Sequence, residues 1–135
     1  MDIKKNIILL GATGSIGESS LRLLRKNKER FNLIGVSAHN NAELLSKIVN
    51  EFDVPNVVLS DPKNADSYYG KNDLYVGHSS LIELAKINCD IVVSGIAGLA
   101  GLIPAYTALN NGNHIAIANK EPLVVAGNIL SLIHI

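Results

Sequence analysis

The chain has 135 residues, a length that fits one compact domain and is too short for two complete domains. Hydrophobic residues make up 47% of it and charged residues 18%, a balance that excludes an intrinsically disordered segment. Lys and Arg together number 12, as do Asp and Glu, so the chain lacks the positive excess with which most nucleic-acid-binding proteins attract phosphate backbones. We therefore expect a folded, soluble domain and no nucleic-acid partner.

The first half of the chain alternates short β-branched runs with segments of helical period. In chain order we expect a strand at residues 7–10, a helix at 16–26, a strand at 33–37, a helix at 42–49 and a strand at 57–59. Asn40 or Asn41 is a suitable N-cap for the second helix. Residues 60–70 are polar and rich in turn formers, with room for a short helix only.

The second half continues the alternation. We expect a short strand at 74–76, a helix at 79–86 capped by Ser79 or Ser80, a strand at 91–94, a helix at 104–110, a strand at 114–118 and a last helix opening at 119–122. Strands that alternate with helices are typical of a parallel sheet covered by helices. The sequence therefore predicts an α/β, Rossmann-like, doubly wound fold: a mainly parallel sheet with helices on both faces.

Two features bear on the cellular compartment. Cys89 is the only cysteine, which excludes an internal disulfide, and the first four residues lack the apolar core of a secretory signal. Residues 91–110 carry no charged side chain and approach the roughly 20 residues that cross a bilayer. Several glycines and Pro104 interrupt this run, so a buried strand followed by a helix is the better interpretation. We expect no membrane partner and a cytoplasmic location.

A glycine motif directly follows the first predicted strand and opens the first predicted helix. Gly11 permits a tight turn out of the strand, Gly14 lets the backbone approach a pyrophosphate, and Gly17 allows close packing of the helix. The helix N-terminus attracts the diphosphate through free N–H groups and its dipole, and Thr13 and Ser15 can add hydroxyl donors. No Lys-Ser/Thr pair follows the motif, which argues against a nucleoside-triphosphate loop. A dinucleotide is the predicted ligand.

The end of the second predicted strand indicates which dinucleotide is preferred. Domains that bind NAD usually place an acid there, about 20 residues after the glycine loop, to accept a hydrogen bond from the ribose 2′-OH. This chain has Ser37, Ala38, His39, Asn40 and Asn41 instead, which are neutral apart from one imidazole that can receive a 2′-phosphate. NADPH is therefore favoured over NADH.

Three segments together carry a family resemblance: Gly-Ala-Thr-Gly-Ser-Ile-Gly at 11–17, Gly-Ile-Ala-Gly-Leu-Ala-Gly-Leu at 95–102 and Asn-Lys-Glu-Pro-Leu-Val at 119–124. With these motifs the chain closely resembles 1-deoxy-D-xylulose 5-phosphate reductoisomerases. The resemblance implies that residues 1–135 form the amino-terminal NAD(P)-binding domain, and that the catalytic and carboxy-terminal domains are absent from this chain. It also implies an enzyme that rearranges and reduces 1-deoxy-D-xylulose 5-phosphate to 2-C-methyl-D-erythritol 4-phosphate in non-mevalonate isoprenoid biosynthesis.

The resemblance also assigns residues. It implies that the cofactor phosphates are contacted by Thr13, Gly14, Ser15 and Ile16, that the adenosine 2′-phosphate is surrounded by His39, Asn40 and Asn41, and that NADPH also faces Asn119 and Glu121. Lys120 is implied on the substrate side. A lysine in the first turn of a helix opposes the helix dipole by up to ~1 kcal/mol unless an anion lies nearby, which agrees with a phosphorylated substrate.

For the full-length enzyme the resemblance implies a homodimer and a divalent metal, Mg²⁺ or Mn²⁺, whose carboxylate ligands follow residue 135. Within the chain, the four histidines show no metal-ligand spacing and Cys89 has no base partner in sequence, so we assign neither a catalytic nor a metal residue. Two alternatives stay open: a semialdehyde-dehydrogenase-like NADP enzyme, whose glycine loop is similar, and a noncatalytic NADP-sensing module.

Overall fold

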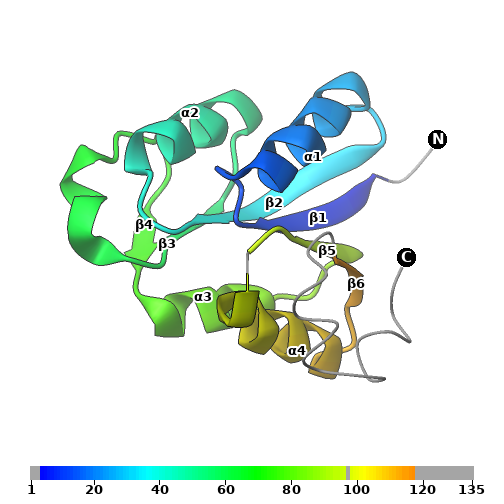
Figure 1. Cartoon of the computed structure of the whole chain (residues 1–135). Helices are drawn as coiled ribbons and strands as arrows, with labels where there is room; N and C mark the ends of the chain where they lie inside the picture. Colours follow the sequence, from blue (N-terminus) through cyan, green and yellow to red (C-terminus); the bar gives the residue numbers. More distant parts are fainter. Residues whose placement is uncertain (1–3, 97, 118–135) are drawn as a thin grey trace.

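The computed structural model describes residues 4–96 and 98–117. Its centre is a six-stranded sheet in the order β4-β3-β2-β1-β5-β6, in which every described pairing is parallel (Figure 1). The strands are β1 (Lys5–Leu10), β2 (Phe31–Ala38), β3 (Asn56–Leu59), β4 (Leu74–Val76), β5 (Ile91–Ser94) and β6 (His114–Ile117). This confirms the predicted Rossmann-like architecture. The strand order reverses between β1 and β5, and the carboxyl edge at such a point is where open α/β sheets bind ligands.

The helices cover both faces of the sheet. Figure 1 shows α1 (Ser15–Lys26) and α2 (Ala42–Phe52) on one face, and α3 (His78–Ala85) and α4 (Leu102–Asn110) on the other. Two short 3₁₀ segments complete the described elements, η1 (Pro62–Ser67) and η2 (Gly98–Gly101). The short helix expected within residues 60–70 is η1. No helix in the described ranges is long and apolar enough to cross a membrane.

The sheet separates two hydrophobic cores. Successive side chains of a strand point to opposite faces, and β1 shows this directly. Ile7 and Leu9 pack in the core under α1 and α2, whereas Ile8 and Leu10 pack in the core under α3 and α4. All four are buried, which explains why the sequence of this strand is apolar without alternation.

β2 contains an irregularity where it pairs with β1. Ile7 lies opposite Leu33, but Ile8 lies opposite Gly35, so Ile34 is an extra residue in the ladder. A Cβ atom on Gly35 would lie 2.8 Å from Leu84 Cδ1 on α3. Any larger residue at this bulge would require the Leu84 side chain of α3 to shift.

Two helix starts differ from the sequence predictions. α3 begins at His78 and its N-cap is Gly77, with no side-chain cap, so the expected capping by Ser79 or Ser80 is wrong. The Ser80 hydroxyl instead donates to the carbonyl of Val76 at 2.8 Å. α4 begins at Leu102 and not at Pro104, because a proline fits the first turn of a helix, where an N–H has no partner to lose. The last predicted helix lies outside the described residues, as does Ala118.

Candidate functional site

The glycine loop joins β1 to α1 at the carboxyl edge of the sheet. Gly11 has φ +75°, a conformation that favours glycine, and a Cβ there would lie 3.0 Å from the carbonyl carbon of Gly95. The loop is also tied to the end of β2, since the N–H of Gly11 donates to Ser37 Oγ at 3.0 Å and the N–H of Ala12 donates to the Ser37 carbonyl at 2.7 Å. Ser37 thus fixes the loop from the neighbouring strand.

Gly14 and Gly17 serve different purposes. Gly14 is the N-cap of α1, is exposed and has no side chain to cap the helix, so the first-turn N–H groups of Ser15 and Ile16 remain available. Gly17 is buried, and a Cβ on it would lie 2.3 Å from the carbonyl oxygen of Ala12. The close packing expected at Gly17 is therefore against the backbone just after β1. The helix N-terminus is held near the sheet and left open to an anion.

The loop after β5 closes the other side of this junction. The N–H of Gly95 donates to the Leu10 carbonyl at 2.8 Å, and a Cβ on Gly95 would lie 3.2 Å from Ile16 Cβ. Gly95 belongs to the second glycine-rich segment found in the sequence. Its role is to let the ends of β1 and β5 and the start of α1 approach one another.

A cavity of about 550 Å³ opens at this edge. Among the predicted site residues it is lined by Gly11, Thr13, Gly14 and His39; Ser15, Ile16, Gly17, Asn40 and Asn41 are not in its lining. The other lining residues lie at or after the ends of strands or on α3 and η2. The sequence analysis named some of them in its motifs without assigning them to the site, and did not single out Ser60, His78 or Leu81; the full set is Ser37, Ala38, Ser60, His78, Leu81, Gly95, Ile96 and Ala100. The one feature in the sequence that could have indicated these residues is their position at or just after predicted strands, because the carboxyl ends of parallel strands meet at one edge of the sheet.

A second, polar cavity of about 370 Å³ lies beside the start of α2. Asn41 is the N-cap of α2, as expected, and its Oδ1 accepts from the N–H of Leu44 at 3.1 Å. Its Nδ2 group therefore remains as a donor. The carbonyl of Asn40 accepts from Asn64 Nδ2 at 3.2 Å, and both asparagines line the cavity with Asn64 and Ser67. Amide groups and a helix N-terminus converge there, together with Glu43 from the first turn of α2.

His39 lies between the two cavities, in the turn after β2. Its Nδ1 is 3.1 Å from Ser60 Oγ, and its Nε2 is 3.9 Å from an Asp61 carboxylate oxygen. The backbone continues the β2–β3 pairing at this point, since the N–H of Asp61 donates to the His39 carbonyl at 2.8 Å. Asp61 is an acid that sequence reasoning did not place at this edge. It follows β3, and the register that brings it beside His39 is visible only in the sheet.

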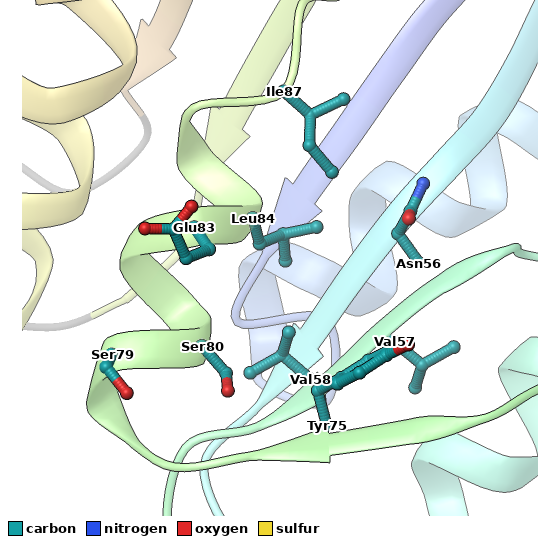
Figure 2. Close-up of a pocket in the computed structure, with 9 residues that line it drawn as sticks. All are labelled: Asn56, Val57, Val58, Tyr75, Ser79, Ser80, Glu83, Leu84 and Ile87. Carbon is teal, nitrogen blue, oxygen red and sulfur yellow. The ribbon is translucent and has the colours of Figure 1, made fainter.

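A further cavity of about 460 Å³ lies between α3 and the strands β3 and β4 (Figure 2). Val58 and Leu84 contribute apolar surface, and Tyr75, Glu83 and Asn56 contribute polar groups. The amide nitrogen of Asn56 already donates to the Ile34 carbonyl at 2.8 Å. This cavity shares no lining residue with the glycine-loop cavity, so it is a separate feature.

Cys89 does not provide a nucleophile for the site. It precedes β5, at the amino edge of the sheet and opposite to the glycine loop, where its N–H donates to Asn113 Oδ1 at 3.3 Å. Burial, and secondarily the charge of Asp90, raises the pKa of the Cys89 thiol to about 11. A protonated thiol is a poor nucleophile at neutral pH. Across residues 4–96 and 98–117, no group of three or more His, Cys, Asp or Glu side chains could hold a metal ion.

The carboxyl edge thus offers an uncapped helix start, a cavity beside it and a second, polar cavity at the start of α2, with no metal-binding cluster within the described ranges. Asn119, Lys120 and Glu121 lie outside those ranges.

Comparison with known proteins gives a consistent assignment. The family model for 1-deoxy-D-xylulose 5-phosphate reductoisomerase matches residues 7–127. Relatives of that name include one from Thermoanaerobacter pseudethanolicus, 42% identical over 130 residues, which cover 93% of this chain and 34% of the relative. Another from Clostridium acetobutylicum is 40% identical over 135 residues, covering 94% of this chain and 35% of the relative. The chain spans about a third of the length of these curated relatives.

Solved structures agree with the sequence matches. The reductoisomerase from Zymomonas mobilis in complex with NADPH superposes with a TM-score of 0.86 at 31% identity, covering 95% of this chain and 35% of that one. A reductoisomerase in complex with NADPH, fosmidomycin and magnesium gives a TM-score of 0.82 at 30% identity, covering 95% of this chain and 33% of that one. This chain therefore belongs to the 1-deoxy-D-xylulose 5-phosphate reductoisomerase family.

Proposed function

We propose that this chain is the NADPH-binding domain of a 1-deoxy-D-xylulose 5-phosphate reductoisomerase. The observation that carries the proposal is the uncapped start of α1 at Gly14, beside the cavity at the reversal of strand order. The N–H groups of Ser15 and Ile16, with the hydroxyls of Thr13 and Ser15, would hold the pyrophosphate there. Gly11 and Gly17 would fix the loop that presents them.

The adenosine end supports NADPH as the cofactor. Neither Ala38 nor His39, at the end of β2, has a carboxylate that could accept a hydrogen bond from a ribose 2′-OH. His39, Asn40 and the free Nδ2 group of Asn41 would surround the 2′-phosphate, close to the N-terminus of α2. The two relatives solved with NADPH support the same choice.

For the full-length protein we propose the family's reaction, conversion of 1-deoxy-D-xylulose 5-phosphate to 2-C-methyl-D-erythritol 4-phosphate, in the cytoplasm and as a homodimer. When bound, the nicotinamide supplies the hydride of the reductive step. Asn119 and Glu121 would also face NADPH, and Lys120 would face the phosphorylated substrate. The divalent metal, Mg²⁺ or Mn²⁺, would be held by residues beyond this chain, in keeping with the magnesium complexes of relatives. This chain alone would bind the cofactor without turnover.

The two alternatives have less support. A semialdehyde-dehydrogenase-like enzyme needs a reactive cysteine near the nicotinamide, whereas Cys89 lies at the opposite edge of the sheet. A noncatalytic NADP sensor would share the binding site, but no feature of the described residues favours it over a reductoisomerase domain. Turnover of 1-deoxy-D-xylulose 5-phosphate by the full-length protein distinguishes it from a sensor.

The substitution Gly14→Asp tests the binding proposal. Gly14 has extended backbone angles, φ −85° and ψ −179°, which suit an N-cap aspartate, and a Cβ there meets only the Gly11 carbonyl at 3.8 Å. The fold should therefore be retained or slightly stabilised. The new carboxylate would occupy the anion site, so calorimetric titration should show NADPH affinity reduced by about 100-fold or more, equivalent to ~2.7 kcal/mol.

Gly14→Ser is the matched control, because it adds a capping side chain without charge. We expect it to weaken NADPH binding by about tenfold at most. If the folded Gly14→Asp variant binds NADPH as tightly as the unmodified chain, the pyrophosphate lies elsewhere and the proposal fails.

A further inference from the structure

The turn after β3 brings a carboxylate beside His39, which lines the glycine-loop cavity, although Asp61 itself lines neither that cavity nor the polar cavity beside α2. Asp61 is held in two ways: its N–H donates to the His39 carbonyl at 2.8 Å, and its Oδ1 accepts from the N–H of Lys63 at 3.1 Å, capping η1. Its Oδ2 is left to face the His39 imidazole at 3.9 Å. The acid that sequence reasoning found missing after β2 is therefore supplied by the neighbouring strand.

Both ring nitrogens of His39 have partners within the domain. Nδ1 faces Ser60 Oγ at 3.1 Å and Nε2 faces Asp61, although three-quarters of the His39 side chain is exposed. A phosphate that binds His39 must take one of these positions. Ser60 is a neutral hydroxyl that can donate or accept, whereas Asp61 is an anion that attracts the same N–H as the phosphate does. Asp61 thus competes with a bound phosphate for the N–H of His39.

The charges indicate whether Asp61 strengthens or weakens the binding of NADPH relative to NADH. A 2′-phosphate carries close to two negative charges, and NADH lacks this group. The contact between His39 Nε2 and Asp61 Oδ2 is exposed and, at 3.9 Å, longer than a hydrogen bond, so Asp61 places a negative charge beside the imidazole without binding it tightly. The competition between Asp61 and a 2′-phosphate for His39 therefore affects NADPH alone.

We propose that Asp61 limits the preference of this domain for NADPH over NADH, by holding the His39 imidazole and competing with the 2′-phosphate for it. Asp61 is a positioning residue in this role, since it acts through His39. The inference rests on the proposed function, because it assumes that a dinucleotide binds with its adenosine end beside β2. It adds a residue that sets the ratio of the two affinities.

Asp61→Asn is the informative variant. The asparagine keeps the oxygen that caps η1 and removes the charge. Calorimetric titrations of the chain with NADPH and with NADH should show the ratio of the NADH to the NADPH dissociation constant rising by about threefold or more. Asp66→Asn is the matched control, since Asp66 is exposed on the 3₁₀ segment that Asp61 caps, and the carboxylate that faces His39 is that of Asp61. This control should leave the ratio unchanged.

A double variant tests the route through His39. In a His39→Ala background, Asp61→Asn should raise the ratio by less than about twofold, because the imidazole for which the two anions compete is absent. A full effect in that background would overturn the route through His39. An equal change in both affinities, or a fall in NADPH affinity alone, would overturn the role in selectivity.

The possible failures are distinguishable. If the unmodified chain binds neither dinucleotide, the proposed function itself fails. If the unmodified chain binds NADPH and Asp61→Asn leaves the ratio unchanged, only the inference about Asp61 fails.

Discussion

At the scale of single residues, Cys89 shows how position determines reactivity. Its thiol is half-buried and its Sγ donates to the Ile91 carbonyl at 3.5 Å. Desolvation, followed by the charge of Asp90, raises the pKa of this thiol to about 11. The reactive thiolate is therefore scarce at neutral pH.

This pKa predicts the pH dependence of alkylation. The rate of Cys89 modification by iodoacetamide in the folded chain should rise about tenfold per pH unit from pH 7 and should not level off below pH 10. The same chain unfolded in urea is the control, and its rate should level off near pH 9. Mass spectrometry of timed samples measures both rates. A plateau below pH 9 in the folded chain would contradict the buried position described above.

Residue roles were predictable where a backbone conformation requires particular residue types at a fixed spacing. The spacing of Gly11, Gly14 and Gly17 after an apolar run indicated the loop, and Asn41 was recognisable as a cap. Asp61 was not predictable as a neighbour of His39, because their contact depends on the register of β2 with β3. Which residues of this edge bind a cofactor stays a prediction.

At the scale of elements, the start of α3 offers a test. Gly77 has φ +99° and ψ 165°, a region that only glycine adopts readily, and open space surrounds its Cβ position. Gly77→Ala should therefore destabilise the fold by about 1–3 kcal/mol through backbone strain alone. Ser79→Ala should change stability by less than about 0.5 kcal/mol, because Ser79 does not cap the helix. Urea denaturation of the two variants measures both values.

If Ser79→Ala destabilised the fold more than Gly77→Ala does, a serine would cap α3 and the backbone at Gly77 would be free of strain. The sequence suggested the serine cap because a hydroxyl before an apolar run is a usual helix start. It did not indicate that Gly77 would turn the chain with a positive φ. Strand and helix types were predicted well from periodicity, whereas the bulge at Ile34 was hidden, since residues 33–36 read as one continuous buried run.

At the scale of the whole molecule, the sheet separates the two cores, and their contributions should be independent. Ile48 of α2 is buried in the core on the face covered by α1 and α2, and Ile115 of β6 is buried in the core under α3 and α4. Ile48→Val and Ile115→Val should each cost about 0.5–1.5 kcal/mol, and the double variant should equal their sum within about 0.5 kcal/mol. Urea denaturation midpoints check the sum. If the free energy of unfolding of the double variant departed from the sum by more than about 1 kcal/mol, the two cores would be energetically coupled across the sheet.

The overall architecture followed from the alternation of strands and helices, which leaves few topologies once crossovers must be right-handed. The strand order itself, with its reversal between β1 and β5, came only from the structure. The full cavity lining was not predictable either, because residues such as Ser60 and His78 are ordinary in sequence and meet only where five strands end at one edge.

The pairing of β1 has a consequence for synthesis of the protein. β1 lies between β2, its near neighbour in sequence, and β5, so that Ile7 pairs with Ile91 and the N–H of Asn6 donates to Asp90, 84 residues later. A ribosome must therefore release the chain through Ser94 before the innermost strand has both neighbours. Until then one side of an apolar strand is open to other nascent chains, so we expect folding of this domain to wait for the synthesis of β5.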